Sequence, residues 1–388
     1  SSSGTYTLNS VQGDVGVVVD STSLFGSRIK ASGAESISIL GNGNINAIIS
    51  GQNTQTINVN ANSGTISVGS SAASTFNLTT DANITLTSAT TKIDNVSTMS
   101  INVGAATADL SGTAFKDMQN LSLAGAGTAS TVLLNDISGS GNNMVITMTG
   151  LEGGVSAFNI FNNSGNITVD AGTMSGAFDI TSLDTSGAGA ITISSGTLGN
   201  FSAGTVNAAS SFTLDASAHT SGSGGITLGS FSASGAVNIS LGSGSGDVSI
   251  LDVTKANTFT LDGANFGGTI DVGSFTSLGN VTVSMGSEGY FSASSVATAG
   301  SFTLDGANAT TGQATIQDIS AQGAITISMG TGSGGVTLQT ATTNGNFTID
   351  ASNFGGEIVT NYVSASGSYV VAVGTNGQYS AVDVNAIG

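Results

Sequence analysis

Short apolar–polar–apolar segments recur along the chain at a nearly constant step. In the clearest stretch, from Thr258 to Val371, the central positions are Thr260, Thr282, Thr303, Thr326, Thr348 and then Val370. Successive steps are 22, 21, 23, 22 and 22 residues. A step of this size, with one short strand at each start, is typical of a solenoid. The same alignment extends upstream through Ser38, Asn58, Asn77, Asn102, Ser122, Thr147, Thr168, Thr192, Thr213 and Asn238.

A second period lies on top of the first. The sequence FTLD or FTID begins at Phe212, Phe259, Phe302 and Phe347, and VNISLG, VTVSMG and ITISMG lie between these positions. Large Phe therefore alternates with Val or Ile at the inward position, which lets stacked layers interdigitate without voids. The outward Asp alternates with Ser, which separates like charges by two rungs, about 9.6 Å. The predicted unit is a pair of rungs of roughly 44 residues.

Each rung is predicted to contain two strands joined by a glycine-bearing turn. We expect the following side chains to point inward: Phe302, Leu304, Ala314, Ile316, Ile319, Ile325, Ile327, Val336 and Leu338. Glycines at 306–312 and 330–335 supply backbone conformations that β-branched residues cannot reach. The predicted fold is all-β, a parallel β-helix (β-solenoid) with rungs of about 22 residues. The alternative is a string of antiparallel sandwiches, and Ala114–Leu123 hints at one short helix.

The regularity of the repeat predicts three segments. Residues 1–35 are the least regular and are expected to be an N-terminal cap or linking segment. Residues 36–150 alternate well but keep the period poorly, which indicates a less regular β-solenoid. Residues 151–388 carry the regular β-solenoid repeats.

Composition narrows the possible partners. The chain has 57 Gly and no Pro or Cys, and its net charge is −18. This charge argues against nucleic acid and anionic lipid as partners, because both attract cationic surfaces. No apolar run approaches the roughly 20 residues of a membrane helix. A start at Ser1 without an apolar leader fits a mature secreted protein or part of a longer one.

Candidate chemistry is sparse, and an enzyme is not expected. His219 is the only histidine, so a catalytic triad would depend on it alone. Some solenoids cleave polysaccharides with clustered acids, but the acids here repeat evenly along the chain. The even column Asp215, Asp262, Asp305 and Asp350 offers oxygen ligands, which favours calcium as the bound ion. The alternative is that these acids are solvated and keep the protein soluble.

Units such as SFTLDGAN (301–308) and GAITISMGTGSG (323–334) carry a resemblance to known proteins. With the acidic, Gly/Ser/Thr/Asn-rich and Cys-free composition, the chain resembles bacterial surface-layer (S-layer) proteins and related β-strand-repeat extracellular proteins of Gram-negative bacteria. The resemblance covers most of residues 36–388. It implies secretion, a lattice or filament on the cell surface, and calcium-dependent assembly. The nonapeptide repeat of calcium-binding β-rolls is missing from this sequence.

We therefore expect a non-enzymatic extracellular structural protein that self-assembles into a surface layer, sheath or filament. Unpaired strand edges at the ends of a solenoid favour association with further copies. Its predicted partners are copies of itself and a cell-surface glycan or lipopolysaccharide. The alternative is a repetitive adhesin stalk or passenger on the cell surface, which would stay monomeric.

Overall fold

The computed structural model describes residues 5–8, 16–20, 27–31, 36–50, 56–68, 75–80, 83–88, 92–93, 97–139, 141–196, 199–219 and 224–388. Within these ranges every regular element is a β-strand. The short helix suggested at Ala114–Leu123 is wrong, because strands β11 (Ala114–Phe115) and β12 (Asn120–Gly127) occupy that segment. Among the described residues no helix is long and apolar enough to cross a membrane.

Contacts divide the chain into two compact units, residues 1–189 and 190–388. The predicted boundaries at 35 and 150 rest on repeat regularity, which is a different criterion, and they stay predictions. The strands of the first unit are β1 (Thr5–Leu8), β2 (Gly16–Asp20), β3 (Ser27–Ala31), β4 (Ser36–Ser50), β5 (Thr56–Val68), β6 (Thr75–Thr80), β7 (Ile84–Ser88), β8 (Lys92–Ile93), β9 (Thr98–Val103), β10 (Thr107–Leu110), β11, β12, β13 (Thr131–Leu134), β14 (Ile137–Gly139), β15 (Met144–Leu151), β16 (Gly154–Asn162), β17 (Ile167–Thr173) and β18 (Phe178–Thr185).

The second unit divides its rungs more evenly. Its strands are β19 (Ile191–Ser194), β20 (Phe201–Ala208), β21 (Phe212–Ala216), β22 (Ile226–Ala233), β23 (Ala236–Leu241), β24 (Val248–Ala256), β25 (Thr258–Asp262), β26 (Thr269–Ser277), β27 (Val281–Ser284), β28 (Tyr290–Thr298), β29 (Phe302–Gly306), β30 (Gln313–Ala321), β31 (Ile325–Met329), β32 (Gly335–Thr343), β33 (Phe347–Ala351), β34 (Glu357–Ala365), β35 (Tyr369–Val373) and β36 (Gln378–Ala386).

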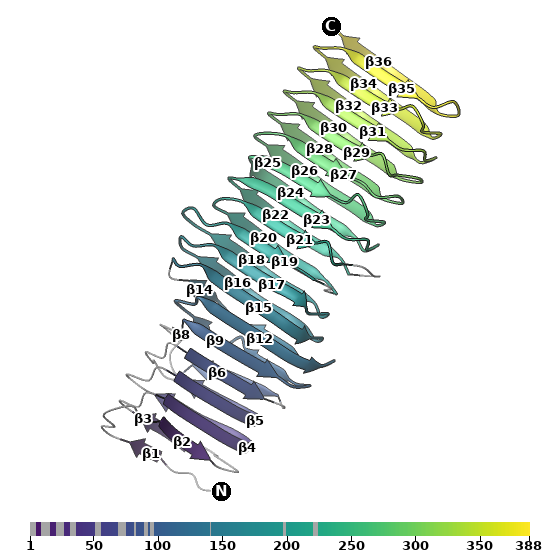
Figure 1. The fold of residues 1–388 in the computed structure, drawn as a ribbon. Coiled ribbons are helices and arrows are strands. Elements are labelled where there is room, and N and C mark those ends of the chain that lie inside the picture. Colours follow the sequence, from purple (N-terminus) through teal and green to yellow (C-terminus); the bar gives the residue numbers. More distant parts are fainter. Residues whose placement is uncertain are drawn as a thin grey trace. The chain divides into compact units, whose positions relative to one another are not determined.

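Parallel pairing between successive rungs builds both units. In the second unit each strand pairs with the strand two places along the chain, as β29 does with β31 and β30 with β32. Figure 1 shows these strands lying side by side within the unit. In the first unit the rungs divide less evenly, since long β5 pairs with both β6 and β7. The predicted fold, an all-β parallel solenoid with rungs of about 22 residues, is confirmed.

The predicted alignment of polar positions is confirmed throughout the second unit. The ladder runs Thr192, Thr213, Asn238, Thr260, Thr282, Thr303, Thr326, Thr348 and Val370. In the first unit part of the predicted alignment is wrong by two residues. Thr147 pairs with Asp170 instead of Thr168, and Ser122 with Ser100 instead of Asn102. A shift of two keeps every side chain on its face, so alternation alone does not detect it.

Phenylalanine layers alternate with smaller layers in the core of the second unit, as predicted. Phe259, Val281 and Phe302 are register partners, and none is more than 1% exposed. Phe259 also meets Phe275 across the core, with ring centroids 4.6 Å apart at 72°. Edge-to-face pairs of this kind add to the stabilisation that comes from burial. Every inward position predicted for the two rungs that begin at Phe302 and Ile325 is buried.

In the second unit, the second strand of each rung bends partway along its length. In β30 the inward residues are Ala314 and Ile316, followed by Ile319 and Ala321. Two exposed residues, 317 and 318, separate these pairs and break the alternation of two. In the second unit the chain therefore covers the core with one short strand and one bent strand in each rung.

A column of glycines lies just before the bent strands, and close approach explains it. A Cβ on Gly334 would stand 1.9 Å from the carbonyl oxygen of Gly312 in the rung before it, and one on Gly356 would stand 1.8 Å from that of Gly334. The expectation that the turn glycines at 306–312 and 330–335 serve unusual backbone angles is wrong, because none of them has a left-handed φ. What the column requires is the absence of a side chain where one backbone passes over another.

Gly334→Ala is expected to destabilise the fold strongly, because its Cβ would overlap a backbone oxygen that cannot move without its rung. Gly335→Ala is the matched control, since the nearest atom to its Cβ, the Glu357 carbonyl oxygen, lies 3.7 Å away. Urea unfolding followed by circular dichroism should show a lower midpoint for Gly334→Ala only. Equal midpoints for the two variants would contradict the close-approach explanation.

Val281→Phe tests the layer alternation. It would place three phenylalanines in consecutive register, from Phe259 to Phe302, and overpack the core. The expected cost is about 1–3 kcal/mol, the range for added volume in a packed core. Val281→Ile is the control, because Ile325 occupies the equivalent place two rungs on. Urea midpoints should fall for Val281→Phe and change little for Val281→Ile.

Candidate functional site

The four predicted calcium ligands form an outward column on the first strand of alternate rungs. Their register is Asp215–Ser240–Asp262–Ser284–Asp305–Ser328–Asp350. All four aspartates are exposed, at the end of a strand where the chain enters a turn. A serine rung lies between each successive pair, so the carboxylates are spaced by about 9.6 Å, twice the strand separation. The predicted alternation of Asp with Ser is confirmed.

Each of these aspartates closes the turn that follows it. Its Oδ1 accepts a hydrogen bond from the backbone N–H two residues on, which is the Asx-turn arrangement. The donors and distances are Ser217 at 3.0 Å, Ala264 at 3.2 Å, Ala307 at 3.0 Å and Ser352 at 3.3 Å. Asp109 and Asp170 of the first unit make the same bond. This backbone bond gives the column a structural role in closing turns, a bond that the even repetition of the acids does not specify.

Asp215 accepts a second hydrogen bond, as Asp109 does from the Ser111 hydroxyl. The Ser217 hydroxyl donates to Asp215 Oδ1 at 2.5 Å, in addition to the backbone bond. The Ser217 hydroxyl and then the Ser217 N–H lower the pKa of Asp215 below its usual value, and partial burial opposes them weakly. The ionised form is therefore favoured by folding.

The structure does not bring the predicted ligands together. In the described ranges, no group of three or more His, Asp or Glu side chains is placed to hold one metal ion. Calcium wants six to eight oxygen atoms, so a single carboxylate of the column would supply only a small part of its shell. His219 lies 8% exposed in a turn beside Gly224 and Gly244. Calcium binding by Asp215, Asp262, Asp305 and Asp350 stays a prediction.

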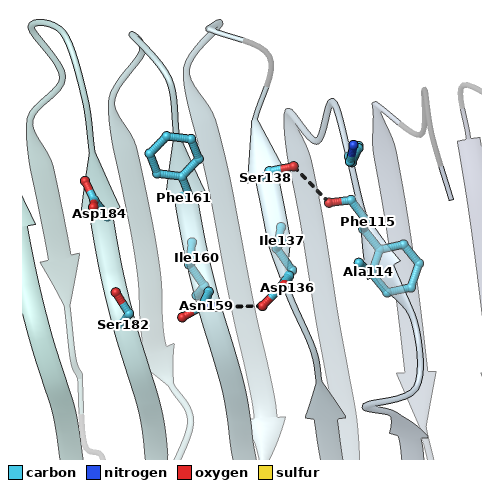
Figure 2. Close-up of a pocket in the computed structure, with 11 residues that line it drawn as sticks. Ala114, Phe115, Asp136, Ile137, Ser138, Asn159, Ile160, Phe161, Ser182 and Asp184 are labelled. Carbon is cyan, nitrogen blue, oxygen red and sulfur yellow. Dashed lines mark hydrogen bonds between the residues drawn. The ribbon is translucent and has the colours of Figure 1, made fainter. Parts of the chain in front are cut away.

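A groove in the first unit is a separate candidate site. It crosses β11, β14, β16 and β18 and has a volume of about 350 Å³ (Figure 2). Strands β11 and β14 have only two and three residues, whereas β16 runs for nine. β11 and β14 pair through Phe115 and Ile137 alone. The outer surface is hollowed where these rungs have their shortest strands.

Two outward rows of side chains line the groove. Ser138, Phe161 and Asp184 are register partners and lie one beside the next in Figure 2. Asn159 and Ser182 form the second row, next to Asp136. Asn159 Nδ2 donates to Asp136 Oδ1 at 2.8 Å, and Ser138 Oγ donates to the Phe115 carbonyl at 3.3 Å. Lys116 completes the lining at the β11 end.

Phe161 stands out because the chain otherwise buries its phenylalanines. Among those whose side chains the structure describes, only Phe158 and Phe161 are not buried. Phe158 is 55% exposed and lies outside the groove, while Phe161 is half-buried within it. Sequence reasoning missed this site, although the run FNIFNN at 158–163 interrupts the usual pattern of small polar outward residues. That interruption was the available signal.

No protein-family model matches this chain, and neither a curated protein nor a solved structure matches it significantly. The resemblance to surface-layer proteins is therefore carried by the sequence features alone.

The Ser217–Asp215 contact predicts a pH-dependent contribution to stability. Because the folded-state pKa is lower than the unfolded one, the contribution is full above the unfolded value of 3.8 and disappears as pH falls through the folded value. Ser217→Ala should lower the thermal midpoint at about pH 7 and have little effect at about pH 2. Ser352→Ala is the control, because the backbone N–H that it donates to Asp350 is retained. An equal Ser217→Ala effect at both pH values would contradict this assignment.

Proposed function

We propose that this chain is a non-enzymatic extracellular structural protein that assembles with copies of itself into a surface layer, sheath or filament. The observation that carries the proposal is the in-register repetition of outward side chains in the second unit. The Thr column and the Asp/Ser column present the same groups at every rung or every second rung. The surface is thus periodic along the stacking direction.

A periodic surface favours association between identical molecules. When two copies lie side by side in register, one favourable contact recurs at each repeat, and the summed contacts are much stronger than any single one. A contact between different faces extends into a filament or sheet when its rotation does not close a ring. Only 7% of residues are charged, so most of the surface that such contacts would bury is uncharged.

Calcium fits this proposal as a bridge between copies. Each column aspartate uses one oxygen atom for its turn, and its remaining lone pairs face outward from an exposed position. A single column supplies too few oxygens for one ion, whereas two facing columns and water supply more. Net charge of −18 also makes copies repel one another until cations neutralise part of it.

The second candidate is an adhesin stalk or passenger that stays monomeric. The groove of the first unit favours it, because its lining does not recur from rung to rung, as expected of a local binding site. A cell-surface glycan or lipopolysaccharide as the partner of the assembled protein stays a prediction.

Electron microscopy of the purified protein, with calcium and then with a chelator, separates the two candidates. We expect regular sheets or filaments in calcium and their loss in chelator. Changing Asp215, Asp262, Asp305 and Asp350 together to Asn keeps the turn acceptors but removes four charges, and it should abolish the calcium dependence. The control changes Asp252, Asp271, Asp318 and Asp383 to Asn, which removes equal charge from the bent strands. Isolated particles under all conditions would overturn assembly in favour of the stalk.

A further inference from the structure

We propose that the groove lined by Phe161, Asp136, Asn159, Ser182, Asp184 and Lys116 binds a saccharide of one or two sugar rings. This inference goes beyond the structural role proposed above and does not depend on self-assembly. It rests on an outward aromatic ring, on the polar groups around that ring, and on the size of the hollow.

The size and shape suit a small ring-shaped ligand. A volume of about 350 Å³ is at the small end of the range for small-molecule sites. The neighbouring strands fix the positions of the lining residues, because Phe161 is in register with Ser138 on one side and Asp184 on the other. Adjacent strands are separated by about 4.8 Å, so the two polar neighbours of the ring are about 9.6 Å apart. A sugar ring stacked on Phe161 would therefore have Ser138 at one edge and Asp184 at the other.

The aromatic ring gives the site its apolar component. Phe161 lies outward and half-buried in a chain whose other described phenylalanines, apart from Phe158, are in the core. Exposing an aromatic ring to water forfeits the stabilisation that burial would give, so a ligand that covers it is favoured. Sugar rings carry a face of C–H groups that packs on such a ring while their hydroxyls point outward to the rim.

The rim matches hydroxyl groups, which both donate and accept hydrogen bonds. Asp136 and Asp184 supply carboxylate acceptors, Lys116 supplies donors, and Ser182 and Asn159 supply both kinds. The bond from Asn159 to Asp136 holds both side chains in place before a ligand arrives. A site fixed in advance loses less entropy on binding.

Other ligand classes fit less well. The lining has two carboxylates, Asp136 and Asp184, and one ammonium group, Lys116, so its charge disfavours an anionic ligand. The net charge of −18 on the whole chain adds to this repulsion. A wholly apolar ligand would strand the polar rim without hydrogen bonds. An organic ammonium ion is the closest competitor, since it would sit over the ring beside the acids. Lys116 opposes it from the β11 end of the groove.

Saturation-transfer NMR and calorimetry on the full chain test the proposal. The probes are cellobiose, maltose and N,N′-diacetylchitobiose, with choline as the cationic comparison. We expect at least one disaccharide to bind and choline to bind weakly or not at all. Phe161→Ala should weaken disaccharide binding about tenfold or more, and Asp184→Asn should weaken it severalfold.

Two matched variants separate binding from folding. Phe158→Ala removes the other exposed phenylalanine of β16 outside the groove, and Asp179→Asn removes an outward acid from the same strand as Asp184. Both should bind the disaccharide like the unaltered protein, and circular dichroism should show all four variants folded. The proposal is overturned if none of the three disaccharides binds, if choline alone binds, or if Phe158→Ala and Phe161→Ala weaken binding equally.

Discussion

Parallel, in-register hydrogen bonding between successive rungs is the constraint on which the rest of this protein depends. It places each residue directly against the residue at the same position in the next rung, about 4.8 Å away. Each side chain must therefore fit beside the one at the same position in the next rung. The chain answers with Phe against Val or Ile inside, Asp against Ser outside, and glycine where carbonyl oxygens approach within 2 Å of a would-be Cβ. All three patterns follow from the stacking of equivalent positions in successive rungs.

This constraint also explains which parts of the fold the sequence could predict. In the second unit, FTLD and its partner segments repeat with little drift, so the strands, the inward residues and the register from Thr192 to Val370 were all predictable. In the first unit the alternation is equally clear but has no FTLD marker. Two strand registers that differ by two residues place the same side chains on the same faces, and the lengths of the loops decide between these registers. The bent second strand was visible in advance only as a step of three, from Ile316 to Ile319.

The candidate sites divide in the same way. The aspartate column was predictable because it repeats, and repetition is what a single sequence displays best. Its turn-closing bonds were not, since the acceptor geometry depends on the exact path of the chain after each strand. The groove around Phe161 was out of reach for the opposite reason. The groove lies where the repeat is irregular, at the very short strands β11 and β14. Its depth depends on how several neighbouring rungs pack together, which the sequence of one rung does not show.

The two-rung period has a consequence for how such a chain changes in length. Removing one rung from the second unit would bring Phe259 onto Phe302 and Asp262 onto Asp305, which places large on large and charge on charge. Removing two adjacent rungs instead joins Phe to Val or Ile and Asp to Ser again. Duplication or loss of genetic material should thus survive in units of about 44 residues far more often than in units of 22. The unit by which this solenoid can lengthen or shorten is therefore two rungs.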